Sequence, residues 1–102
     1  MIKINGKRWR VLMVSPSHPV LVHKSGPPAI GCCDDPTKTI YISNTLSSSM
    51  IRKVLIHEIV HATLFSYNVR MSDDIEEIVA DTVATYGDEI ISLTNLTYDR
   101  IR

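Results

Sequence analysis

The sequence changes from a strand pattern to a helix pattern within residues 39–62, which read TIYISNTLSSSMIRKVLIHEIVHA. Residues 39–43 alternate in polarity and are rich in β-branched and aromatic side chains, which indicates a β-strand. Beyond them, apolar side chains recur every three to four positions, as on one face of a helix. Ser47 or Ser48 can cap this helix at its N-terminus, and we expect it to continue to about Tyr67.

Two hairpins are expected before this helix. Asn5 and Gly6 supply the positive φ angles of a tight turn between two short strands, the second of which ends near Val14. A second hairpin joins residues 29–33 to the strand at 39–43. Residues 15–28 contain four of the five prolines and are expected to form a long loop.

A second helix is expected to start with a capping-box-like pair, Asp73 and Glu76. Its apolar face would carry Ile75, Val79 and Val83. The helix is expected either to stop near Gly87, with residues 88–96 forming a third helix, or to continue through a kink. Because strands come first and helices follow, we predict an α+β fold, with two or three helices packed on an antiparallel or mixed sheet in a single domain.

Composition excludes some functional classes. Eleven basic residues balance eleven acidic ones, so no nucleic-acid partner is expected. The sequence shows neither a long apolar segment nor a signal-peptide pattern, so a cytoplasmic protein without membrane contact is expected. Cys32 and Cys33 are adjacent, point to opposite faces of a strand, and are expected to be partly buried thiols.

The sequence His57-Glu58-Ile59-Val60-His61 places two imidazoles one helical turn apart. Such a pair can bind one zinc ion, and Glu58 can then act on a water molecule held at the metal. Three polar groups in the apolar centre of a helix also need a reason, because burying them without partners is unfavourable. We therefore predict a zinc site.

A catalytic zinc ion needs a third protein ligand. Glu77 and Asp81 lie four positions apart on the second helix, so Glu77 could bind the ion while Asp81 orients a ligand histidine. His18 and His23, in the loop, are weaker candidates. Glu76 is interpreted as the cap residue of its helix and not as a ligand.

The pattern His57-Glu58-x-x-His61 followed by Glu77-x-x-x-Asp81 resembles the signature of the gluzincin metallopeptidases. With its small size and the preceding strand, the chain is similar to minimal gluzincins and to phage and bacterial domains of the ImmA/IrrE type. The resemblance covers about residues 40–88. It implies a zincin-like fold, Zn²⁺ bound by the two histidines and Glu77, Asp81 bonded to a ligand histidine, and Glu58 as general base of a peptidase.

Larger gluzincins have an extra histidine or tyrosine that stabilises the transition state. In this chain Tyr67, Tyr86 and Tyr98 are candidates to hydrogen-bond the oxyanion. We expect a peptide substrate to bind by strand addition along residues 39–43, whose apolar residues Ile40 and Ile42 would face the core while the strand's backbone edge stays free.

An alternative is a zinc-binding regulatory or interaction module without hydrolytic activity. It would close the metal site with a fourth ligand from His18, His23 or Cys33. A latent enzyme is also considered, in which the C-terminal residues 94–102 lie across the cleft and bring Tyr98 or Asp99 to the metal. A tail packed on the helices is the competing expectation.

Overall fold

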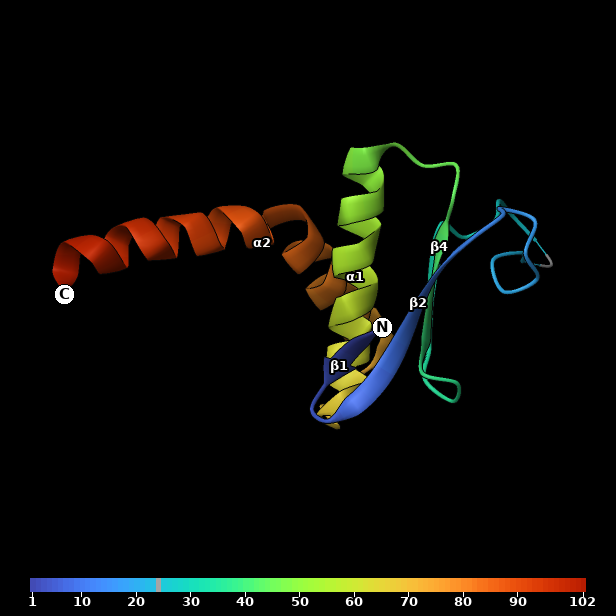
Figure 1. Ribbon diagram of the computed structural model, residues 1–102, viewed down its shortest axis with the longest axis horizontal. Coiled ribbons are helices and arrows are strands. Elements are labelled where there is room, and N and C mark those ends of the chain that lie inside the picture. The colour runs from blue at the N-terminus through green and yellow to red at the C-terminus, as the bar shows by residue number, and fades with distance from the viewer. Residues whose placement is uncertain (24) are drawn as a thin grey trace.

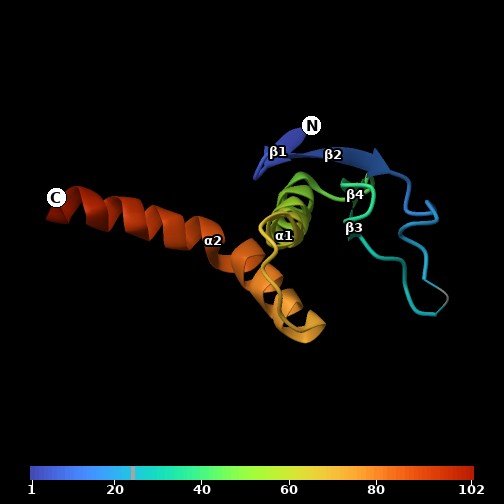
Figure 2. The same cartoon turned by 90° about the horizontal axis from the view of Figure 1, so that it is seen from below.

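The computed structural model describes residues 1–23 and 25–102 and has the expected α+β architecture, a mixed sheet followed by two helices (Figure 1). The four strands are β1 (Ile2–Ile4), β2 (Lys7–Val14), β3 (Gly31–Asp34) and β4 (Thr39–Ser43). The helices are α1 (Ser48–Ser66) and α2 (Asp73–Ile101). Seen from below, α1 lies along one side of the sheet, and α2 crosses α1 on the side that faces away from the sheet (Figure 2).

Both predicted hairpins are confirmed. β1 pairs with β2 in an antiparallel manner around Asn5 and Gly6, whose φ angles are 49° and 75°. β3 and β4 form the second antiparallel pair, with Cys33 opposite Ile40. The segment between β2 and β3 contains no helix or strand among its described residues, in agreement with the predicted loop; residue 24 lies outside the described part.

The expectation that residues 39–43 keep a free edge is wrong. The strand order is β1-β2-β4-β3, so β4 is hydrogen-bonded on both sides. Its partner on the second side is β2, which runs parallel to it, with Val11 opposite Ile40. The long loop makes this parallel pairing geometrically available, because parallel neighbours need a long crossover connection. A peptide cannot add to β4, and the strand at this end of the sheet is β3.

The core lies between the sheet and α1. Trp9, Ile40, Ile42, Val54 and Ala62 form a buried cluster, contributed by β2, β4 and α1. Burial of such side chains is the main driving force that fixes α1 on the sheet. Packing on the sheet therefore fixes the rotation of α1 about its own axis. This rotation sets the direction in which every other side chain of α1 points.

The first hairpin also binds the end of α1. The indole Nε1 of Trp9 donates a hydrogen bond to Oγ of Ser66 at 2.8 Å. The side chains of Asn5 and Lys7 donate to the carbonyl oxygen of Ser66 at 2.9 and 3.2 Å. The last carbonyls of a helix lack partners within the helix, so these bonds satisfy one of them and anchor the C-terminal turn.

The helix starts agree with the prediction for α1 and differ for α2. Ser47 caps α1, and its side chain accepts a hydrogen bond from the backbone N–H of Met50. The cap of α2 is Ser72, whose side chain accepts from the N–H of Ile75, so the helix begins one residue earlier than the predicted Asp73 cap implied. Glu76 is therefore not the glutamate of a capping box, which would stand three residues after the cap.

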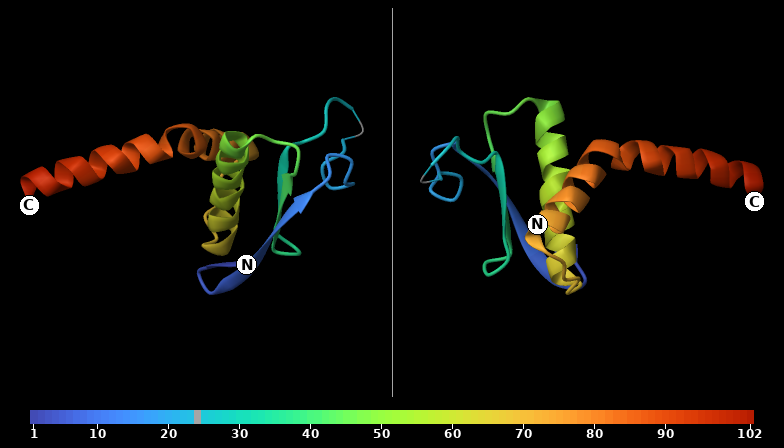
Figure 3. Two further views of the ribbon diagram at one scale, coloured as in Figure 1. Left: turned by 45° about the horizontal axis from the view of Figure 1, so that its top comes forward. Right: turned by 180° about the vertical axis from the view of Figure 1, so that it is seen from behind.

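Helix α2 is continuous through Gly87 and includes most of the C-terminal tail. It bends about halfway, and its second half projects away from the sheet and α1 (Figures 1 and 3). Residues 94–102 thus neither lie across a cleft nor pack on the other helix, contrary to both expectations for the tail. None of the helices in the described chain is long and apolar enough to cross a membrane.

Candidate metal centre

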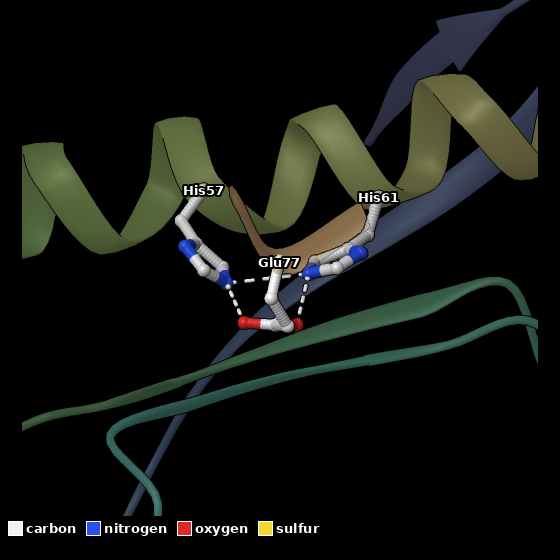
Figure 4. A group of neighbouring side chains, drawn as sticks. All are labelled: His57, His61 and Glu77. Atoms are coloured by element: carbon white, nitrogen blue, oxygen red, sulfur yellow. Dashed lines mark hydrogen bonds and ion pairs between the residues drawn. The ribbon is translucent and has the colours of Figure 1, made fainter. Parts of the chain in front are cut away.

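Three side chains from the two helices converge on one point (Figure 4). The Nε2 atoms of His57 and His61, one turn apart on α1, are 3.2 Å from each other. Glu77, in the second turn of α2, places Oε2 3.3 Å from Nε2 of His57 and Oε1 2.8 Å from Nε2 of His61. Tetrahedral zinc with bonds of about 2.0–2.1 Å separates its ligand atoms by about 3.3 Å. The three groups therefore have the spacing of a zinc ligand set.

The outer nitrogen of each imidazole faces a carboxylate. Nδ1 of His57 lies 2.9 Å from Oδ1 of Asp81. Nδ1 of His61 lies 3.0 Å from Oε2 of Glu76. Since a carboxylate only accepts, each neutral ring carries its proton on Nδ1 and turns the lone pair of Nε2 toward the centre. This is the usual way in which proteins prepare a histidine to bind a metal.

The charges at this centre favour a cation. With protons on both Nδ1 atoms, two nitrogen lone pairs and the carboxylate of Glu77 face one another, and these groups repel. Four carboxylates surround the two rings, from Glu58, Glu76, Glu77 and Asp81. A divalent cation relieves the lone-pair repulsion and offsets part of this negative charge, so the donor set fits zinc chemically as well as geometrically.

Glu58 follows His57 on α1 and is nearly enclosed, with 7% of its surface exposed. Burial raises the pKa of this carboxyl from its usual 4.5 to about 7; the charge of His57 lowers the pKa and that of Glu77 raises it. A carboxyl that titrates near neutral pH can both accept and return a proton. The sequence prediction placed Glu58 over the opening of the site, and its burial between α1 and β3 puts it at the wall of the cavity described next.

A cavity of about 450 Å³ opens beside the three converging side chains. β3 forms one wall with Gly31, Cys32 and Cys33, and His23 from the long loop adds another side chain. A second cavity of about 370 Å³ shares Ala29, Gly31, His57 and Glu58 with the first and continues along α1 to an apolar region; it is lined further by Ile30, Met50, Lys53, Val54, Asp81 and Ala84. Through these shared residues the two cavities join into one open channel, which passes the metal centre and the beginning of β3.

The three tyrosines are not brought to this channel. Tyr67 follows α1, whereas Tyr86 and Tyr98 lie on α2, and all three side chains are more than half exposed. None of them lines either cavity. Tyr98 lies instead on the projecting half of α2, in a shallow groove of that helix.

The candidates for a fourth ligand lie outside the ligand cluster. Among the described residues, the only group within metal-binding distance consists of His57, His61 and Glu77. Nδ1 of His18 accepts a hydrogen bond from the N–H of Val20, away from the cluster. Burial, followed by the charge of Glu58, raises the pKa of Cys33, which keeps it a neutral thiol. An ion at this centre would keep an open coordination position.

Glu76 is the residue of this candidate centre that the sequence interpretation missed. Its side chain is 16% exposed and bonded to His61, although it was assigned to the helix cap. Two ligand histidines need two orienting partners, whereas only Asp81 had been named. The missing partner of the second histidine was the signal available in the sequence. With Ser72 as the cap, Glu76 is not needed at the helix start and can take this role.

Comparisons of the chain with protein-family models, with curated proteins and with solved structures found no match. The functional argument therefore depends on the centre itself. Its parts are a three-ligand cluster, two carboxylates behind the rings, a buried carboxyl at the cavity wall and an adjoining channel. Together these parts can bind a cation, hold a substrate beside it and move a proton.

Proposed function

We propose that the protein is a zinc-dependent peptidase in which His57, His61 and Glu77 hold the ion and Glu58 is the general base. One observation carries the proposal: both Nε2 atoms and the Glu77 carboxylate converge while the outer nitrogens are bonded to carboxylates. An ordinary pair of helix histidines has no need of such an arrangement. A ligand set of two imidazoles and one carboxylate is one that catalytic zinc uses.

When bound, zinc would lower the pKa of water to about 7 and would polarise a carbonyl group. The protein's contribution is proton transfer by Glu58. Its carboxylate takes the proton of the attacking water as the new C–O bond forms. It then returns this proton to the peptide nitrogen as the C–N bond breaks, so that the products are a carboxylic acid and an amine. Because burial raises the pKa of Glu58 to about 7, its carboxyl group can both accept and return the proton near neutral pH.

We place the substrate along β3 in place of the buried strand β4. Within the described chain β3 is the last strand of the sheet, so one row of its backbone groups has no strand partner. Gly31, Cys32 and Cys33 of β3 also line the larger cavity beside the metal centre, and Gly31 lines the smaller one as well. An extended peptide that added to this edge would pass the zinc ligands and Glu58.

His23 is our candidate for stabilising the negative oxygen of the tetrahedral state. The side chains around the larger cavity include Glu58, Glu76 and Glu77, all of which would repel that oxygen. Apart from the two metal ligands, His23 is the only imidazole among the described residues that line it. A neutral or protonated imidazole donates a hydrogen bond, which is the property an oxyanion requires.

The deciding experiment combines a zinc assay with a peptide library, applied to the wild type and to Glu58→Gln. The proposal expects one zinc per chain in both, and cleavage by the wild type that falls by about 10²–10⁴-fold in the variant. Asp74→Asn, an exposed carboxylate on α2, is the matched control and should cleave like the wild type. Bound zinc without cleavage by any of the three proteins would favour the non-hydrolytic binding module. Equal cleavage by Glu58→Gln would remove the assigned base.

A further inference from the structure

Six large apolar side chains are exposed on the second half of α2. Large apolar side chains there are at least half exposed, namely Ile90, Ile91, Leu93, Leu96, Tyr98 and Ile101. This half projects away from the sheet and α1, so none of the other segments that the structure describes covers it (Figure 3). Exposed apolar patches of this kind mark interaction sites, and a helix of this length gains most of its stability from packing.

The side chains on α2 are sorted by size. Toward α1 the helix presents small residues, with Ala80 fully buried and Ala84 partly buried. The exposed side carries larger residues at alternating spacings of three and four, namely Val83, Tyr86, Ile90, Leu93 and Thr97. This spacing is that of a seam between two packed helices. The outer face is therefore patterned to receive another helix.

The charges beside the seam are complementary to those of a second copy of α2 that runs in the opposite direction. Glu89 and Arg100 are about three turns apart, so they lie on the same flank of α2. Both are exposed, and neither takes part in an ion pair within the described chain. If two copies pack antiparallel about Leu93 and Thr97, Glu89 of each copy comes to lie opposite Arg100 of the other. The two helix dipoles also oppose each other in this arrangement.

We propose that a second copy of this chain covers the exposed face of α2, in an antiparallel and two-fold symmetric helix pair. This assembly is independent of the proposed hydrolysis. The interface is small, because the projecting half of α2 is roughly 24 Å long and about 10 Å wide. It belongs at the low end of specific interfaces, below about 1,200 Å² of buried surface. The dimer is therefore reversible, with monomer prevailing at low concentration.

The first test is the mass of the full chain in solution, measured by analytical ultracentrifugation from micromolar to near-millimolar concentration. The wild type should pass from one chain to two. Leu93→Asp places a charge in the seam and should remain monomeric over the whole range. Ser92→Asp adds the same charge on the opposite, polar side of α2 and should dimerise like the wild type. Far-ultraviolet circular dichroism verifies that the variants fold, since all these positions are exposed.

The second test fixes the orientation. Glu89→Arg and Arg100→Glu should each weaken dimerisation by about 2–5-fold, the range of exposed ion pairs, and the double variant should restore it. A wild type that is monomeric throughout overturns the proposal. So does a dimer that survives Leu93→Asp, since another surface then holds it. Failure of the double variant to recover would overturn the antiparallel pairing.

Discussion

Gly31 lies so close to Glu58 that position 31 has no room for a side chain. A Cβ atom on Gly31 would be 2.8 Å from Oε2 of Glu58 and 2.6 Å from Cγ1 of Val54. Steric space explains this glycine, and its backbone conformation does not, since its φ angle is not in the left-handed region. The missing side chain allows β3 to approach α1 where the proposed general base is buried.

Gly31→Ala should therefore displace either β3 or the Glu58 side chain. We expect the free energy of unfolding to fall by about 1–3 kcal/mol, as for other overpacked sites, and kcat/KM for peptide cleavage to fall with it. Urea denaturation and steady-state kinetics measure the two effects. Gly87→Ala is the control, because its new Cβ meets only the side chain of Val83, at 3.3 Å. Wild-type stability and activity in Gly31→Ala would contradict the close approach.

Substitutions of the two adjacent glutamates of α2 should have different effects on the affinity for zinc. Glu77→Ala removes a ligand and should abolish tight binding. Glu76→Ala leaves Nδ1 of His61 without its acceptor and should weaken binding by about 10–100-fold, the usual effect of losing such a partner. Competition with a chelator gives both values, and Asp74→Ala in the same region of α2 is the control. Unchanged affinity in Glu76→Ala would show that its bond to His61 does not support the metal.

His23→Ala should lower kcat by about 10²–10³-fold, with zinc content and KM close to the wild type. The reason is that hydrogen bonding to an oxyanion matters in the transition state and little in the bound substrate. His18→Ala is the matched control, since this imidazole packs at a tilted angle against Tyr41 outside the cavity. If kcat is unchanged in His23→Ala, another donor must stabilise the oxyanion.

The metal-free protein should become less stable as pH rises from about 4.5 to about 7. Glu58 has a pKa near 7 when folded and near 4.5 when unfolded, so over this window the folded state binds the extra proton. Stability is greatest below the unfolded value and is lost as pH rises through the folded one. One pKa unit corresponds to about 1.4 kcal/mol. After chelation, the stability difference between wild type and Glu58→Gln should change across this window; a constant difference would contradict the folded pKa.

Local signals in the sequence predicted the parts of the molecule that depend on neighbouring residues. The Asn5-Gly6 turn and the Ser47 cap both follow from side chains within a few positions of the element that they define. The convergence of His57 and His61 follows from helix geometry alone. Glu77 was placed correctly even with the helix cap misassigned, because its face relative to Asp81 does not depend on where the helix starts.

The failures concern relations between distant segments. No local feature of residues 39–43 distinguishes an edge strand from an interior one, since that depends on parallel pairing with β2 across the long loop. The apolar residues of the tail suggested docking on the same chain, whereas α2 continues as a helix and carries them away. The oxyanion candidates failed to reach the cavity for the same reason: tyrosines were chosen by residue type, and only the fold places His23 there.

The hydrogen bond between Trp9 and Ser66 joins two segments that are synthesised at different times. The residues that form the metal centre all lie on two consecutive helices, whereas the first hairpin must wait for the end of α1 before its indole finds an acceptor. Local contacts form faster than distant ones, because less chain entropy is lost in closing them. The metal centre nevertheless needs Glu77, which leaves the ribosome after Ser66, so β2, β4 and the end of α1 can associate before the centre is complete. In the proposed zinc protein the ion would bind last, and its binding energy would stabilise the contact of α2 with α1 and not the sheet.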